Sequence, residues 1–520
     1  MHPLVTLENR NTNMEKYDEC ASIIRIMQKE PDVAHPKRGL PNPGKRPDCA
    51  QFSAGLQRIN EAYLQGNEVY SMDRVLPAEK KFFNSGNGSP LLQMPFPPAV
   101  QAMTELFRNP MISQYGYASG DEGCRQKVAE YLTKENIHVG EGGANVTKNH
   151  LIFFNSTTEA FTVLMQVLCR PGDVVLFTAP TYGLLAYAPE RAGGMAEFLP
   201  LKEEDGWLIN PDALRNKIME INRDLAQCAV YPYKPCVTAF VNLNPHNPTG
   251  LVMGNSERSR LIAISDICKE NGVFVIDDII YRDLCYDSEN RALPVASLPR
   301  AFSNTITMFG TSKCYGLAGA RAGAVAADEV IIRSLRNRIF QMMDSMSLQV
   351  AYLMAGSFYS AEDRDSVCQQ YFTPIIQAYK RNWELVHLLV NGNKAQAATL
   401  DKDTKELLHR EFGNDMQHIL ADGIEGISIA GNIYPQSGFF CLLDFTALKG
   451  RRDPITGQTL DTEIQLLYYF FRTANVKLLT GNSFAWPNSE EFVARFSFAY
   501  TREDLVRMIR QIYDSIQQLE

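Results

Sequence analysis

The sequence has no apolar run that could cross a membrane, because none approaches the roughly 18 residues that a spanning helix needs. Its eleven cysteines form no CxxC pair and no cluster with histidine. This scatter excludes the usual zinc-site patterns and favours free thiols in a reducing compartment. The first twenty residues lack a basic start followed by an apolar stretch, so we expect no secretory signal and a cytoplasmic location.

An excess of positive charge is also missing, since 51 Lys and Arg residues stand against 59 Asp and Glu residues, for a net charge of −8. A general nucleic-acid binder needs a basic surface, and this balance argues against one. The sequence shows no internal repeat and no low-complexity tract. With 520 residues, 45% of them apolar, the chain is long enough for two domains with separate cores. We therefore expect a mildly acidic enzyme that binds no nucleic acid, no membrane and no metal.

Three regions are predicted along the chain. Residues 1–75 form an N-terminal extension, with helical patterns at 19–30 and 51–67 and an irregular Pro/Gly-rich connector at 35–49. Residues 111–345 form a large α/β domain. Residues 76–110 together with 346–520 form a smaller, discontinuous α+β domain, which carries a charged insert near 394–425.

In the large domain, short apolar strands alternate with helical patterns. Strands are predicted at 151–154, 174–180, 238–245, 274–278 and 306–310, and helices at 161–169 and 257–271. Such alternation predicts a doubly wound, largely parallel sheet, whose ligands bind beyond the carboxyl ends of its strands. The smaller domain is predicted to hold helices at 369–389 and 502–518 and strands at 438–445 and 494–500.

The stretch TSKCYGLAGARAG, residues 311–323, places Lys313 among small residues, with Arg321 eight positions later. A solvated charge pair needs no such glycine-rich surroundings, whereas glycine lets the backbone approach a ligand closely. We interpret Lys313 as the covalent anchor of an aldehyde cofactor and Arg321 as a ligand of its phosphate.

A carboxylate at the end of an apolar strand, in VIDDIIY, is suited to a protonated ring nitrogen. Burying Asp278 is costly unless it is paired, and a pyridinium is a suitable partner that stays electron-poor. Tyr281 and the Asn247 amide, in NPHNPTG, would both donate to the ring's phenolic oxygen. Two alternatives stay open: Asp278 caps a turn, or a one-residue shift of the strand presents Asp277 instead.

A candidate phosphate site lies in FNSTTEAF, where Ser156, Thr157 and Thr158 stand between a strand and a helix. Backbone N–H groups and hydroxyls at a helix N-terminus bind anions, although an N-cap without a ligand is the simpler reading. Tyr182, in APTYGLLAY, would stack on a flat ring or simply pack. Tyr115, in QYGYASG, is either functional or part of a surface loop.

Arg495 lies between apolar residues in a predicted strand near the C-terminus, where an arginine needs a carboxylate partner. That partner is either a structural Asp or Glu or the α-carboxylate of a substrate. Tyr117, Phe484 and Trp486 are considered as the lining of a pocket for aromatic side chains.

Together these motifs, in this order, resemble the fold-type I, class I/II aminotransferases, which use pyridoxal 5′-phosphate. The resemblance runs from about Gly88 to the C-terminus, apart from the insert. It implies a seven-stranded sheet, a Lys313 aldimine with Lys313 as proton shuttle, and a homodimer with shared active sites. It also implies cofactor contacts for the following residues: Ser156, Thr157, Thr158, Tyr182, Asn247, Asp278, Tyr281, Ser312 and Arg321.

The resemblance further implies that Tyr115 reaches the phosphate in the neighbouring subunit and that Arg495, with Gly88 and Asn247, binds the substrate. Two departures stand out. Gly310 replaces a serine that many members carry three residues before the lysine, for which Thr311 or Ser312 would compensate, and Ser156 replaces a glycine.

The expected reaction moves an amino group between an L-amino acid and a 2-oxo acid. The same cofactor would also serve a lyase, a decarboxylase or an oxidase. A regulator built on this fold is a third possibility, but it would carry a basic DNA-binding module, and the first 75 residues show no such pattern.

Overall fold

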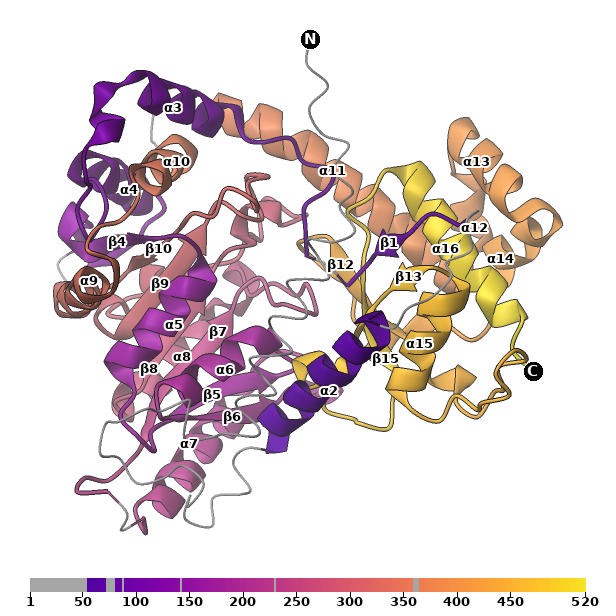
Figure 1. Ribbon diagram of the computed structural model, residues 1–520, viewed down its shortest axis with the longest axis horizontal. Coiled ribbons are helices and arrows are strands. Elements are labelled where there is room, and N and C mark those ends of the chain that lie inside the picture. The colour runs from indigo at the N-terminus through magenta and orange to yellow at the C-terminus, as the bar shows by residue number, and fades with distance from the viewer. Residues whose placement is uncertain (1–53, 72–79, 87, 141–142, 229–230, 359–363) are drawn as a thin grey trace.

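The computed structural model describes residues 54–71, 80–86, 88–140, 143–228, 231–358 and 364–520. Its centre is a seven-stranded sheet with strand order β4–β10–β9–β8–β7–β5–β6 and helices on both faces (Figure 1). Every neighbouring pair is parallel except the two that involve β10. The expected α/β fold with a mostly parallel seven-stranded sheet is confirmed. The strands are β4 (Leu151–Phe154), β5 (Val174–Ala179), β6 (Met195–Pro200), β7 (Val237–Leu243), β8 (Phe274–Asp278), β9 (Thr305–Gly310) and β10 (Gly323–Ala326).

The five strands predicted from the sequence all occur, whereas β6 and β10 were not singled out. Glu197 interrupts the apolar pattern of β6. The four residues of β10 directly follow the glycine-rich lysine segment, so their short apolar run could not be separated from that turn. Both missed strands become evident only through their neighbours in the sheet.

Both faces of this sheet are covered, which explains why its strands are apolar throughout. Along β5, Val174 and Leu176 pack into one core cluster, whereas Val175 and Phe177 pack into the other. This alternation is what a strand buried on both faces requires. The helices around the sheet are α5 (Thr157–Leu168), α6 (Tyr187–Arg191), α7 (Pro211–Leu225), α8 (Arg258–Glu270) and α9 (Glu329–Met343).

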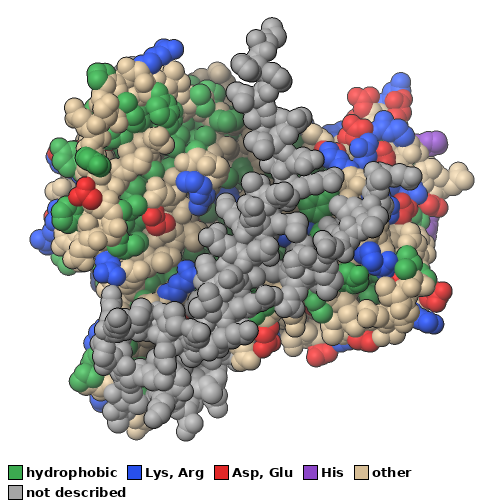
Figure 2. Space-filling model, in the orientation of Figure 1, with side chains coloured by type: hydrophobic (Ala, Val, Ile, Leu, Met, Phe, Trp, Pro, Cys, Tyr) green, Lys and Arg blue, Asp and Glu red, His purple; other side chains and the backbone are tan. Residues whose placement is uncertain are grey.

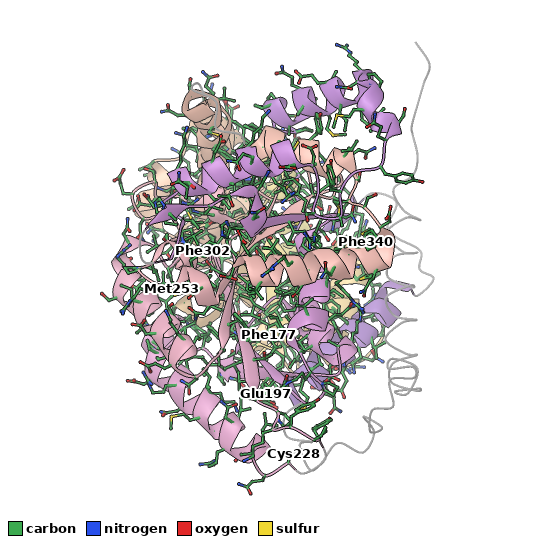
Figure 3. The ribbon with its side chains drawn as sticks, turned by 90° about the vertical axis from the view of Figure 1, so that its left-hand side faces the viewer. Phe177, Glu197, Cys228, Met253, Phe302 and Phe340 are labelled. Carbon is green, nitrogen blue, oxygen red and sulfur yellow. The ribbon has the colours of Figure 1, made fainter. Side chains whose placement is uncertain are left out.

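A further group of helices packs beside β4, at one edge of the large sheet. It comprises α3 (Pro97–Arg108), α4 (Glu122–Lys134) and α10 (Leu348–Phe358), and α10 packs on both of the others. Figure 2 shows apolar side chains gathered on the surface over these helices. Figure 3 shows α9 on the neighbouring side, with Phe340 at one end of the helix and Phe177 of β5 deeper in the molecule. The small hairpin β2 (His138–Val139) and β3 (Ala144–Asn145) follows α4.

The C-terminal part is built on a four-stranded antiparallel sheet of order β11–β12–β15–β14. These strands are β11 (Ser428–Ile429), β12 (Phe440–Asp444), β14 (Leu479–Thr480) and β15 (Val493–Ser497). Here β1 (Phe83–Asn84) pairs in parallel with β13 (Val476–Lys477). Residues before α3 therefore join the C-terminal part, as a discontinuous small domain requires, while the exact domain boundaries stay a prediction.

The two helices predicted for this part occur as α11 (Arg364–Asn391) and α16 (Arg502–Gln517), whereas the helices of the charged insert and α15 (Glu463–Thr473) were not singled out. The insert folds into α12 (Lys394–Ala398), α13 (Lys402–Phe412) and α14 (Met416–Asp422). No helix within the described ranges is long and apolar enough to span a membrane.

The helix predicted at 51–67 is found as α2 (Ala54–Ser71), which packs on α15 and on the short helix η14 (Gly481–Phe484). In Figure 1, α2 lies across the junction of the two parts of the molecule. The helix predicted at 19–30 and the connector at 35–49 lie outside the described residues.

Candidate active site

One cavity of about 310 Å³ lies at the carboxyl ends of the parallel strands, between the large sheet and the C-terminal part. Every predicted site residue except Tyr115 lines it. The fold thus collects residues from distant segments, since Gly88 and Arg495 are 407 residues apart in the sequence. The predicted residues at its wall are Gly88, Ser156, Thr157, Thr158, Tyr182, Asn247, Asp278, Tyr281, Ser312, Lys313, Arg321 and Arg495.

The start of α5 forms one end of the cavity. Ser156 is the N-cap, and its hydroxyl accepts a hydrogen bond from Glu159 N at 3.1 Å. Thr157 and Thr158 occupy the first turn, where backbone N–H groups have no partner inside the helix and attract anions. Arg321 lies at the same end, exposed and with a positive φ of 58°, and its Nη1 donates to Ala318 O. This donor set suits a phosphate.

Two glycines allow β9 and β10 to pass close to this helix start. A Cβ at Gly323 would lie 2.7 Å from Thr157 N, and a Cβ at Gly310 would lie 2.8 Å from Ala322 O. The second distance explains why position 310 carries no serine. Of the two residues considered as compensation, Ser312 lines the cavity, whereas the Thr311 hydroxyl is directed to Ala322 O.

The two neighbouring acids at the end of β8 point to opposite sides. Asp278 lines the cavity and accepts a hydrogen bond from Ile280 N at 3.1 Å, and burial raises its pKa to about 6 despite the nearby Lys313 ammonium. Asp277 is fully buried, and it accepts from Asn242 Nδ2 and from Val295 N, both at 2.7 Å. The alternative of Asp277 as the cavity acid is therefore excluded, because successive side chains of a strand face opposite ways.

Lys313 reaches the middle of the cavity from the loop after β9. Its Nζ donates to Gly88 O at 2.6 Å, and a Cβ at Gly88 would lie 3.3 Å from that nitrogen. Burial and the positive charges of Arg495 and Arg321 together lower the Lys313 pKa to about 8, against the opposing effect of Asp278. A lysine with this pKa is neutral, and hence nucleophilic, far more often near pH 7 than an ordinary lysine.

Arg495 lies on β15 and lines the cavity, and only 5% of its surface is exposed to solvent. Its Nη1 donates to Asn247 Oδ1 at 3.0 Å, its Nη2 donates to Gly86 O at 2.7 Å, and its guanidinium lies over the Phe440 ring. Among the described residues nothing accepts a hydrogen bond from Arg495 Nε, and no carboxylate pairs with the guanidinium. A structural Asp or Glu partner is thus absent from the described part of the chain, which leaves this cation suited to an incoming carboxylate.

Tyr281 and Tyr182 complete the predicted set at the wall. The Tyr281 hydroxyl lies near Gly88, and burial raises its pKa. Tyr182 follows β5 and is half-buried at the cavity. Tyr115 is the exception, since it is 92% exposed on the surface and contributes nothing to the cavity of its own chain.

None of the three residues considered for an aromatic pocket lines the cavity of its own chain. Phe484 and Trp486 are buried in a small core cluster of the C-terminal part, where Trp486 stacks on Trp207 at 4.8 Å between ring centroids. Ser483 of the same segment lines the cavity, whereas the side chains of Phe484 and Trp486 belong to the core. Tyr117 is 64% exposed and lies away from the cavity.

Sequence reasoning missed part of the wall and one buried histidine. The missed wall residues come chiefly from α2, β14 and η14, namely Ala62, Tyr63, Gly66, Leu479, Thr480 and Ser483. His246, inside the NPHNPTG turn, contacts the hydroxyls of Thr178 at 3.1 Å and Thr249 at 2.8 Å. Burial lowers the His246 pKa to about 4, so it braces this turn as a neutral ring. Its place in the motif was the only available signal.

No group of three His, Cys, Asp or Glu side chains in the described residues is placed to hold a metal ion. The described wall of the cavity instead holds hydroxyls, one amide, one carboxylate and the three cations Arg321, Lys477 and Arg495, around the reactive Lys313. This arrangement can hold a phosphorylated aromatic aldehyde and a carboxylate beside it.

A family model described as "Aminotransferase class I and II" matches residues 83–512. The LL-diaminopimelate aminotransferase of Nitratidesulfovibrio vulgaris (strain DP4) is 27% identical over 271 residues, which are 52% of this chain and 63% of that protein. The cystathionine beta-lyase PatB of Bacillus subtilis (strain 168) is 27% identical over 239 residues, 45% of this chain and 56% of that protein. These alignments span less than two thirds of either relative.

Solved structures support the fold. The crystal structure of the aspartate aminotransferase of Rhizobium meliloti superposes with a TM-score of 0.66 at 16% identity, covering 88% of this chain and 96% of that one.

Proposed function

This chain belongs to the aminotransferase class I and II family, a family that depends on pyridoxal phosphate, and on that premise we propose that it moves an amino group between an L-amino acid and a 2-oxo acid. The observation that carries the proposal is the single cavity in which Lys313, Asp278 and Arg495 meet. Amino acids and oxo acids are the proposed small-molecule partners, and the cytoplasm is the proposed location.

The cavity residues fit pyridoxal phosphate. Ser156, Thr157 and Arg321 would hold the phosphate, where the bare Cα of Gly323 leaves room that a side chain would fill. Asp278 would pair with the ring nitrogen, and it is the only carboxylate in the described wall of the cavity.

Other wall residues would hold the ring itself. Asn247 and Tyr281 would donate to the ring oxygen, and Tyr182 would stack on the ring. Pyridoxal phosphate, when bound, supplies an electron sink for the negative charge that develops at the substrate Cα.

The chain's own residues then bind the substrate and move its proton. Arg495 would bind the α-carboxylate through its remaining donor capacity, held in place by Asn247 and Gly86. Lys313 is neutral often enough at neutral pH to take the proton from the substrate Cα and to return it. Because Gly88 has no side chain, Lys313 Nζ can approach the backbone closely, at 2.6 Å from Gly88 O.

Carbon–sulfur bond cleavage is the second candidate reaction. The similarity to a protein named cystathionine beta-lyase favours it over decarboxylation or oxidation. Both reactions begin with the same proton removal by Lys313, so cavity geometry alone does not separate them. Their products do, because a lyase releases ammonia and keeps the cofactor in its aldehyde form.

The test is a screen of amino acids against the purified holoenzyme. We expect at least one amino acid to convert the cofactor to its amine form with release of one oxo acid per site, and a second oxo acid to reverse the change. Ammonia release with an unchanged cofactor would reject transamination in favour of the lyase.

A second test locates the cofactor. Borohydride reduction followed by peptide mass spectrometry should find the cofactor on Lys313. The matched control is Lys477→Met, because Lys477 is the other lysine in the described wall of the same cavity. Lys313→Ala should abolish trapping and Lys477→Met should preserve it; trapping at any lysine in the Lys313→Ala protein would contradict the assignment.

We also propose that the enzyme acts as a homodimer with shared sites. Large apolar side chains are exposed on the face formed by α3, α9 and the segments beside them, among them Val100, Phe107, Phe340 and Met342 (Figure 2). Exposed Tyr115 belongs to the loop next to this face and fits a residue that completes the neighbour's site.

Subunit mixing tests the shared site. Lys313→Ala and Tyr115→Ala proteins, each of low activity alone, should regain activity when they are unfolded and refolded together, because the hybrid contains one intact site. Mixtures that stay as inactive as the two parents would show that Tyr115 does not serve a neighbouring subunit.

A further inference from the structure

Two buried hydroxyls lie at the substrate end of the cavity and are used by none of the proposed steps. Thr480, on β14, and Ser483, on η14, both line the cavity, at 6% and 2% exposure. Their oxygens are 3.1 Å apart. Thr480 pairs with Ala494, the neighbour of Arg495 along β15, so the two hydroxyls lie one strand away from the proposed carboxylate site.

The loop that carries Ser483 is held tightly against the large sheet. Thr181 N donates to Phe484 O at 2.8 Å, and a Cβ at Gly183 would overlap the Ser483 carbonyl. Ser483 is thereby fixed between the Tyr182 loop and the strand of Arg495. This part of the wall lines the same cavity as Arg495 and would therefore adjoin the side chain of a substrate held there.

The hydroxyl pair ends on a carboxylate, that of Glu463 in the first turn of α15. Glu463 Oε2 accepts from Asn482 Nδ2 at 2.8 Å and from Asn482 N at 3.4 Å. The Thr480 hydroxyl is a further hydrogen-bond partner of this carboxylate. The three residues therefore form a chain from Glu463 through Thr480 to Ser483 at the cavity.

An ionised carboxylate at one end sets the direction of every hydrogen bond in such a chain. A carboxylate only accepts, so Thr480 must donate its single hydroxyl hydrogen to Glu463. The Ser483 hydrogen then goes to the Thr480 oxygen. Ser483 is left with lone pairs and no hydrogen for the cavity, so it can accept from a substrate but cannot donate to one.

We propose that Ser483, oriented by Thr480 and Glu463, is a specificity subsite that accepts a hydrogen bond and selects amino acids whose side chain ends in a donor, such as a hydroxyl or a primary amide. The inference rests on the proposed function, because it takes Arg495 as the binding site of the substrate carboxylate. It disfavours side chains that end in a carboxylate, which would face lone pairs only.

A second chamber of about 300 Å³ lies behind the wall and gives Glu463 access to solvent. It shares Ala62, Leu467 and Thr480 with the main cavity. Burial raises the Glu463 pKa to about 7, whereas Asn482, Thr480 and the positive charge of Arg58 lower it. The other charged groups that line this chamber are Glu61 on α2, Lys449 after β12, Asp461 before α15 and Glu490 before β15.

Binding of unreactive acids to the holoenzyme tests the subsite without any turnover. The probes are γ-hydroxybutanoate against pentanoate and β-hydroxypropanoate against butanoate, two pairs that differ in a hydroxyl for a methyl at two chain lengths. At a pH well above 7, calorimetry should show the hydroxy acid of one pair binding about 3- to 10-fold more tightly, which is the size of one hydrogen bond.

Variants assign that preference to residues. Ser483→Ala and the isosteric Thr480→Val should bring the ratio close to one, with cofactor still trapped on Lys313 as the sign of an intact fold. The control is Thr473→Val, which removes a buried hydroxyl bonded to Tyr469 O on α15, outside both chambers. A wild type without preference, or a preference that survives Ser483→Ala, would overturn the proposal.

The orientation of the Ser483 hydroxyl is tested separately, by comparing the affinity of the holoenzyme for glutaramate with its affinity for glutarate. When Glu463 is protonated it can donate to Thr480, the chain reverses, and Ser483 donates to the cavity. The preference for the amide over the acid should therefore fall as the pH drops through about 7. It should be independent of pH in Glu463→Gln; an equal pH dependence in that variant would refute the role of Glu463.

These outcomes are separate from those of the proposed function. If no amino acid changes the cofactor spectrum, the proposed aminotransferase activity is wrong. If the enzyme transaminates but binds both acids of each pair with equal affinity, only the proposed subsite is wrong.

Discussion

The charge balance around Lys313 makes a prediction that can be measured before any substrate is known. Burial and the cations Arg495 and Arg321 lower the Lys313 pKa from 10.5 to about 8. At pH 7 an amine with a pKa of 8 is neutral about one time in ten, against about one in three thousand at 10.5, so the structure implies a gain on the order of 300-fold in reactive amine.

The perturbation is Arg495→Met, which removes one cation and keeps an unbranched side chain of similar length. Burial is the largest cause and remains, so we expect the Lys313 pKa to rise by about half a unit to one unit and the labelling rate at pH 7 to fall about 3- to 10-fold. Asp278→Asn should act in the opposite direction, because the Asp278 carboxylate raises this pKa. Arg495→Lys keeps the charge and serves as the control.

The assay uses the cofactor-free protein and a small amine-selective acylating reagent, so that cofactor binding does not enter. Labelling of the Lys313 peptide is followed by mass spectrometry across pH, with an exposed lysine such as Lys402 as internal reference. A wild-type midpoint near 10.5, or equal midpoints for Arg495→Met and Asp278→Asn, would refute this account of the site.

Three further substitutions test how the scaffold holds the site. Gly323→Ala brings a Cβ to 2.7 Å from Thr157 N, so we expect cofactor affinity, measured by titration, to fall about tenfold or more; unchanged affinity would exclude a ligand at that helix start. His246→Leu leaves two buried threonine hydroxyls without their ring partner and should lower the free energy of unfolding in denaturant by about 2 kcal/mol or more, whereas a neutral effect would show that the turn holds itself. Trp207→Ala removes the stack on Trp486 and should cost about 2–3 kcal/mol by the same measurement, unless the second ring repacks into the space.

The motifs that carry the chemistry were readable from the sequence because each is local. Lys313 with Arg321 lies within one loop, Asp278 with Tyr281 within one turn, and Ser156 begins one helix. The rule that ligands bind at the carboxyl ends of parallel strands then predicts that these turns meet, and the cavity confirms that they do. Family and fold followed from the order of these motifs and are confirmed as well, while the individual roles of the residues stay predictions.

Local sequence patterns did not decide which of two neighbouring acids, Asp277 or Asp278, faces the cavity. Asp277 and Asp278 differ by one step along β8, and it is the pairing of that strand with β7 and β9 that turns Asp278 to the cavity and Asp277 to Asn242. Register is a property of neighbouring strands, so a single strand's sequence could not decide it.

What only the tertiary structure decided is the substrate end of the cavity. Helix α2, β14 and η14 bring Tyr63, Thr480 and Ser483 to one wall although more than 400 residues separate the first from the last. No spacing rule connects such segments, because their contact follows from how α2 packs on α15 and how the two parts of the chain close on each other. The sequence alone predicted which residues gather at the proposed cofactor end, because each element there brings its own residues to the end of a strand. The wall formed by α2, β14 and η14 depends on packing between elements, and it therefore became visible only in the folded molecule.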